Sequence, residues 1–131
     1  MEQGNLIDTN TLIYFLNAQL PEKGHLILQE VFEKGASVLF ISQIELLCFP
    51  SITDEQTGKI LQLLSLVTIY NVDALIIEKT IAIRKAFKLK LPDALIAATA
   101  LTNHCRIITR NSKDFSKVPD LIVLNPFEIE A

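Results

Sequence analysis

The segment Leu6-Ile7-Asp8-Thr9-Asn10-Thr11 joins a short apolar run directly to an acidic residue and a polar stretch. The run Asn5–Ile7 has the length of a strand, and residues Thr9–Asn17 follow it with helical spacing. A strand that passes at once into a helix is the repeating unit of α/β proteins. The segment therefore predicts a buried strand with Asp8 at its carboxyl end.

Further apolar runs of strand length recur along the chain: Val38–Ile41, Leu66–Tyr70, Arg106–Thr109 and Leu121–Leu124. They lack polar alternation, which is typical of strands buried on both faces. Helical patterns also recur: Thr9–Asn17, His25–Lys34, Gln43–Cys48, a helix capped by Asp54 that ends at Leu64, one capped by Asp73 that ends near Phe87, and one from Pro92 to about Asn103. This alternation predicts one α/β domain over residues 1–131, a three-layer α/β/α sandwich with a mainly parallel five-stranded sheet.

The composition is that of a globular domain, because 50% of the 131 residues are hydrophobic and 21% are charged. No apolar run approaches the roughly 20 residues of a membrane-spanning helix, and no export signal precedes the first strand. We expect a cytoplasmic protein without a membrane partner. Cys48 and Cys105 stand alone in apolar contexts, and we expect both to be buried free thiols in a reducing compartment.

The net charge of −3 conceals an asymmetry along the chain. Residues 1–78 hold three basic and ten acidic side chains, whereas residues 79–117 hold nine basic ones and only two acids, Asp93 and Asp114. A phosphate backbone responds to such a local basic surface rather than to the overall charge. Ordinary solvated helix faces would give the same counts, so the basic segment alone does not decide the function.

Four acidic residues fall near the expected carboxyl ends of different strands. Asp8 can cap the helix that follows it, whether or not it also takes part in chemistry. Glu45 has apolar neighbours at positions 44, 46 and 47, so it is either a buried charge that needs a partner or part of an exposed stripe. Each of these two residues has a structural explanation of its own.

Asp93 and Asp114 are the other two acids. Asp93 opens a helix of small apolar residues, where it gains from the helix dipole but is also the only carboxylate. Asp114 belongs to the turn after a strand, and ordinary turn chemistry accounts for it and for Asn111. Gathered at one sheet edge, the four acids would repel one another unless a cation neutralised them. Oxygen ligands without His or Cys suit Mg²⁺ or Mn²⁺.

Four ordered motifs of the chain resemble the PIN-domain family, and within it the VapC-type toxins of toxin–antitoxin pairs. They are Asp-Thr-Asn at 8–10, Ser-x-x-Glu at 42–45, Leu-Pro-Asp-Ala-x-Ile-Ala-Ala at 91–98 and Thr-Arg-Asn-x-x-Asp-Phe at 109–115. No single motif is specific. Their order and spacing over almost the whole chain make the resemblance strong.

The resemblance implies a Mg²⁺-dependent endoribonuclease that uses a metal-activated water, forms a homodimer and is inhibited by a cognate antitoxin. Carried over by position, the acidic quartet would be Asp8, Glu45, Asp93 and Asp114. Asp8, Asp93 and Asp114 would bind the metal, although position 111 competes with position 114 for that place. Supporting groups would be Thr9, Thr109 and Asn111, and candidates for holding the RNA backbone are Arg110, Lys113, Lys88 and Lys90.

Two alternatives remain open. A haloacid-dehalogenase-like phosphatase would explain Leu-Ile-Asp-Thr-Asn-Thr-Leu, but its chemistry normally needs a second Asp where this chain has Asn10. A non-catalytic PIN-like module that binds RNA or a protein partner is the other alternative. The complete set of four acids argues against it.

Overall fold

The computed structural model describes residues 3–129, and its centre is a five-stranded sheet with the order β3-β2-β1-β4-β5. All four strand pairs are parallel. The strands are β1 Gly4–Ile7, β2 Ser37–Leu39, β3 Thr68–Tyr70, β4 Cys105–Ile108 and β5 Val123–Leu124. The predicted α/β class with a parallel five-stranded sheet is therefore confirmed.

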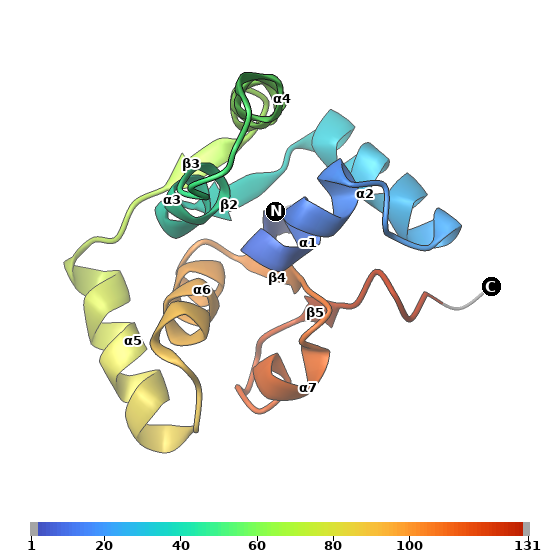
Figure 1. Ribbon diagram of the computed structural model, residues 1–131. Coiled ribbons are helices and arrows are strands. Elements are labelled where there is room, and N and C mark those ends of the chain that lie inside the picture. Colours follow the sequence, from blue (N-terminus) through green and yellow to red (C-terminus); the bar gives the residue numbers. More distant parts are fainter. Residues whose placement is uncertain (1–2, 130–131) are drawn as a thin grey trace.

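Helices cover both faces of this sheet (Figure 1). They are α1 Thr9–Leu16, α2 Glu22–Lys34, α3 Phe40–Leu47, α4 Asp54–Leu64, α5 Ala74–Ala86, α6 Leu91–Thr102 and α7 Ser112–Phe115. Side-chain caps begin three of them: Asp8 accepts from the backbone of α1, Thr53 forms a capping box on α4, and Asp73 accepts from the backbone of α5.

Two hydrophobic cores lie on opposite faces of the sheet. One contains Leu6 and Ile107 with buried residues of α5 and α6. The other contains the next residue of each strand, Ile7 and Ile108, with buried residues of α1, α2, α3 and α4. Successive strand residues point to opposite faces. Both faces are covered, and this explains why the strand sequences show no polar alternation.

Several element boundaries differ from the sequence prediction. The run predicted as the strand Val38–Ile41 divides, because β2 ends at Leu39 and Phe40 already begins α3. Helix α2 begins at Glu22, three residues before the expected His25. Thr53 rather than Asp54 caps α4. A short apolar run buried between two layers has no period that separates strand from helix.

The prediction that both cysteines are buried is wrong for Cys48. Cys105 is buried in β4, but Cys48 is exposed immediately after α3. The helix directs Ser42 and Leu46 into the protein, so its face towards the core has passed before Cys48 is reached. Within residues 3–129, no helix is long and apolar enough to cross a membrane.

The topology brings distant segments to one edge of the sheet. The chain builds β1, β2 and β3 in one direction and then returns to place β4 and β5 on the other side of β1. Ligands of open α/β sheets bind outside the carboxyl ends of the strands at such a switch point. The starts of α1, α3 and α7 follow β1, β2 and β4 there.

Candidate active site

Asp8 lies at the carboxyl end of the central strand β1 and is only 9% exposed. Its Oδ1 accepts a hydrogen bond from the backbone N–H of Thr11 at 2.9 Å, and its Oδ2 accepts one from the Thr109 hydroxyl. Burial raises the pKa of Asp8, although the hydrogen bonds from Thr109 and Thr11 oppose the rise. The cap is therefore real, and it leaves a buried carboxylate between β1 and β4.

Thr9 connects α1 to α3 at the same edge. Its hydroxyl donates to Glu45 Oε1 at 2.8 Å and lies 2.9 Å from the hydroxyl of Ser42, which is 1% exposed. Glu45 itself is exposed, so the interpretation of its surroundings as an exposed stripe is correct. Even so, its charge raises the pKa of Asp8, which places Glu45 within electrostatic reach of the first acid.

Asp93 lies in the first turn of α6, after Pro92 near the helix start. Ala94, Ala97 and Ala98 are fully buried, which lets α6 approach the sheet closely. Burial raises the pKa of Asp93, and the charges of Asp8, Asp114 and Glu45 raise it further, while Lys90 acts against them. Helix α6 leads directly into β4, whose first residue Cys105 pairs with Gly4 at the start of β1. The helix therefore runs from the edge where β1 ends to the edge where β1 begins, and Asp93 in its first turn lies on the side of Asp8.

Asp114 lies in α7, a short helix that the sequence prediction described only as a turn. Hydrogen bonding from the Asn111 side chain and from Lys117 lowers the pKa of Asp114, and its Oδ1 lies 3.4 Å from Lys117 Nζ. The side chain is 43% exposed. The Asn111 N–H in turn donates to the Thr109 hydroxyl at 3.0 Å, so positions 109, 111 and 114 form one connected loop.

The four acids are brought to one edge of the sheet, since each of the other three raises the pKa of Asp93. They are not drawn into a tight cluster, because no three Asp, Glu, His or Cys side chains within residues 3–129 are grouped closely enough to hold a metal ion. The donor set nevertheless fits a hard cation. It offers carboxylate oxygens whose burial and mutual repulsion a bound Mg²⁺ or Mn²⁺ would relieve.

The basic segment 79–117 does not form a single surface. Arg110 lines a pocket with Asp8, and the charges of Lys90 and Lys113 lower the pKa values of Asp93 and Asp114 respectively. Arg106, by contrast, donates to Asn5 Oδ1 at 2.6 Å near the starts of β1 and β4, at the far edge of the sheet. Lys88 is exposed in the loop between α5 and α6. The basic residues next to the acids are thus fewer than the sequence count suggests.

An open pocket of about 300 Å³ adjoins Asp8 and is lined by polar and aromatic side chains. Its lining residues are Asp8, Asn10, Tyr14, Arg110 and Asn111. The sequence argument did not single out Tyr14. The signal that could have found it is helical spacing, since Asn10 and Tyr14 are four residues apart on α1 and share a face.

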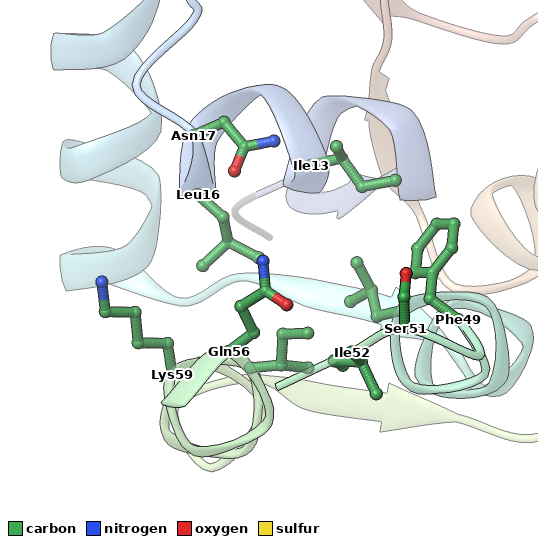
Figure 2. Close-up of a pocket in the computed structure, with 10 residues that line it drawn as sticks. Ile13, Leu16, Asn17, Phe49, Ser51, Ile52, Gln56 and Lys59 are labelled. Carbon is green, nitrogen blue, oxygen red and sulfur yellow. The ribbon is translucent and has the colours of Figure 1, made fainter. Parts of the chain in front are cut away.

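A larger pocket of about 380 Å³ lies away from the acids, between α1, α3 and α4 (Figure 2). Ile13, Leu16 and Asn17 of α1 border one side of it, and Phe49, Ser51, Ile52, Gln56 and Lys59 border the other. Phe49 is 52% exposed. We call this pocket the apolar groove. None of the four acids lines it.

The sequence matches the PIN domain family model over residues 6–121, and the chain belongs to this family. No curated protein is similar enough to count as a match. Among solved structures, a toxin–antitoxin complex from Klebsiella pneumoniae is 32% identical, with a TM-score of 0.78 over 96% of this chain and 100% of that one.

More distant structures share the fold. VapBC2 from Rickettsia felis, bound to a DNA fragment, is 22% identical with a TM-score of 0.79 and covers 92% of this chain and 97% of that one. VapBC from Salmonella typhimurium, also bound to DNA, is 18% identical with a TM-score of 0.80 and covers 95% and 99%. The family resemblance seen in the sequence motifs is confirmed, and the VapC-type likeness is confirmed at the level of the fold.

Proposed function

We propose that this chain is a Mg²⁺-dependent endoribonuclease and the toxin of a toxin–antitoxin pair. The observation that supports this best is electrostatic: the charges of Asp8, Asp114 and Glu45 all raise the pKa of the half-buried Asp93. Bringing several like charges close to a partly buried carboxylate is unfavourable unless a partner compensates them. Membership of the PIN family, whose members are generally nucleases, favours a cation and a phosphodiester as that partner.

In this proposal Asp8, Asp93 and Asp114 bind the metal, with Asn111 the alternative to Asp114. A bound Mg²⁺ would acidify and orient a water and stabilise charge on the phosphoryl oxygens. Thr109 fixes the Asp8 carboxylate by donating to Oδ2, and Thr9 fixes Glu45 by donating to Oε1. Glu45 is exposed to solvent and within reach of both buried acids, so it is suited to accept a proton from the attacking water.

Basic side chains around the acids would hold the RNA backbone. Arg110 lines the pocket beside Asp8, and Lys90 and Lys113 flank Asp93 and Asp114. Lys88 precedes Lys90 in the same exposed loop. Binding through these cations would weaken as the salt concentration rises. The overall negative charge is no obstacle, because the acids near the site are those that the metal neutralises.

The similarity to solved toxin–antitoxin structures also suggests protein partners for this chain. The Klebsiella structure is a toxin–antitoxin complex, so we propose that an antitoxin binds this chain. We propose a homodimer as well, on the resemblance to VapC-type toxins. Co-expression with the product of a short adjacent reading frame should give a stable complex and suppress RNA cleavage. A chain that cleaves RNA but has no such neighbour would be a nuclease without the toxin role.

The test of the catalytic proposal is metal-dependent cleavage. The purified chain should cleave single-stranded RNA with Mg²⁺ or Mn²⁺, lose this activity in EDTA and regain it when the metal is restored. Asp8→Asn should lower cleavage by about 100-fold or more and keep the fold, because Asn caps a helix as well as Asp does. Mg²⁺ should also raise the unfolding temperature of the wild type and not of Asp8→Asn.

The outcomes separate the alternatives. Hydrolysis of p-nitrophenyl phosphate without RNA cleavage would favour the phosphatase, for which the PIN family match gives no support. RNA binding without cleavage under any metal would favour the non-catalytic module. Full activity of Asp8→Asn would show that the site assignment is wrong.

A further inference from the structure

Arg110 is a cation beside Asp8 that forms no ion pair with a carboxylate of residues 3–129. It follows β4, is exposed, and lines the pocket that contains Asp8. Throughout the described residues 3–129, the ion pairs join only Lys34, Lys59 and Lys117 to carboxylates. A guanidinium has five N–H donors and suits phosphate oxygens. Arg110 is therefore available to an anion that approaches the pocket.

Two aromatic rings fix the position of this guanidinium. It lies 4.1 Å from the centroid of the Phe127 ring and 5.4 Å from that of Tyr14, and its Nη1 donates to the Tyr14 hydroxyl at 3.1 Å. The two rings meet edge to face, with centroids 5.0 Å apart and planes at 75°. We call Tyr14 and Phe127 the aromatic clamp. Stacking on ring faces attracts a cation without neutralising it.

Asn125 links the segment that bears Phe127 to the loop after β4 that bears Arg110. It is 9% exposed, and its Nδ2 donates to the Arg110 carbonyl at 3.1 Å and lies 3.3 Å from the Ser112 hydroxyl. Its Oδ1 accepts from the Phe127 N–H at 2.9 Å. One buried amide thus fixes the backbone on both sides of the Arg110–Phe127 contact.

Helix α2 fixes the segment that bears Phe127 from the other side. A Cβ on Gly24 would lie 2.1 Å from the Pro126 carbonyl oxygen, so the helix and the segment meet with no room for a side chain. Arg110 is consequently held by α1, by its own loop and by the segment after β5. Among residues 3–129, ring contacts of this kind are found for Arg110 and not for Lys88, Lys90 or Lys113. A lysine does not reproduce the planar guanidinium.

We propose that Arg110, positioned by the aromatic clamp, binds an RNA phosphate next to the acidic site, and that Tyr14 and Phe127 act as positioning residues. This inference rests on the proposed ribonuclease function. A cation already ordered before the RNA arrives loses less freedom on binding, which strengthens the contact.

The test is steady-state cleavage of a short single-stranded RNA by the Mg²⁺-loaded chain at several salt concentrations. Arg110→Ala and Arg110→Lys should raise KM by about 10- to 100-fold and change kcat far less. For Arg110→Ala the slope of log kcat/KM against log salt should become shallower by about 0.7, the value for one phosphate on a single strand. Lys59→Ala removes an exposed cation on α4 and should change neither quantity.

The clamp itself is tested with Phe127→Leu and Phe127→Tyr. The leucine variant keeps an apolar side chain without a ring face and should raise KM, whereas the tyrosine variant keeps the ring and should restore it. If Phe127→Leu lowers the unfolding temperature but leaves KM unchanged, the clamp only secures the C-terminal segment and the inference is wrong.

Arg110→Lys with an unchanged KM would overturn the inference while wild-type cleavage still supported the proposed function. A wild-type chain that does not cleave RNA under any metal would overturn both.

Discussion

Helix α1 separates two hollows that differ in chemistry. Asn10 and Tyr14 line the polar pocket of about 300 Å³ beside Asp8. One step around the same helix, Ile13 and Leu16 line the apolar groove of about 380 Å³ between α1, α3 and α4. The larger hollow contains none of the acids. Volume alone would therefore point away from the proposed catalytic acids.

One short helix, α1, contributes side chains to both the polar pocket and the groove. Residues three and four apart share a helix face, so α1 divides its eight residues between the core, the pocket and the groove. The pocket has one buried carboxylate, Asp8, whose pKa burial raises, and one clamped arginine, which are features of a reactive site. The groove has one exposed apolar side chain, Phe49, beside partly buried ones such as Ile13 and Leu16, and an exposed aromatic ring in a hollow fits a surface that another protein covers.

The largest effect is expected from Asp93→Asn, which should affect activity and stability in opposite directions. Cleavage of RNA should fall by about 100-fold or more, because a metal ligand is lost. The free energy of unfolding in EDTA should rise, because burial and three neighbouring acids destabilise the ionised form of Asp93. Urea unfolding and a gel assay of RNA cleavage measure the two quantities.

The pH dependence of that stability change has a definite sign. A carboxyl whose folded pKa is raised binds its proton more tightly in the folded state than in the unfolded state. The contribution of Asp93 to wild-type stability in EDTA should therefore fall as the pH rises above 3.8, the ordinary value for Asp, and through the raised pKa of Asp93. Asp93→Asn should lose this part of the decline. Glu33→Gln, on the exposed face of α2, is the matched control and should behave as the wild type does.

A smaller effect is expected from Thr109→Val, which keeps the shape of the side chain and removes its hydroxyl. The hydroxyl donates to Asp8 Oδ2 and accepts from the Asn111 N–H, so it orients one proposed ligand and the loop of another. The Mg²⁺ concentration for half-maximal cleavage should rise by about 10-fold. Thr109→Ser should restore it. Equal Mg²⁺ requirements in the valine variant and the wild type would show that Thr109 only fills space.

Much of the fold could be predicted from the sequence, because local patterns decide it. The apolar runs, the Asp8 and Asp73 caps and the Pro92 helix start all depend on neighbouring residues. The boundary inside Val38–Ile41 could not be predicted, because burial on both sides removes the periodic signal. The exposure of Glu45 beside buried acids was equally open, since it depends on how α3 lies against α1.

The candidate site, like the fold, has a part that local sequence predicts and a part that depends on tertiary packing. Motif order placed Asp8, Glu45, Asp93 and Asp114 at one edge, because strand ends and helix starts can be located from local sequence. The aromatic clamp could not be predicted, because Tyr14 and Phe127 meet only through the packing of α1 against the segment after β5. Asn125 has the sequence signature of an ordinary turn residue. Its two backbone contacts belong to the tertiary structure.

The smallest effect is expected from Phe49→Ser in the apolar groove. Phe49 is 52% exposed and lies outside both cores, so the free energy of unfolding should change by no more than about 0.5 kcal/mol. RNA cleavage should stay within about twofold of the wild type, because the fold is kept and none of the four acids lines the groove. Binding of the proposed antitoxin should weaken if the groove is its contact. A clear loss of cleavage with an intact fold would instead place the groove on the path of the RNA. The polar pocket and the groove would then not serve separate functions on the two sides of α1.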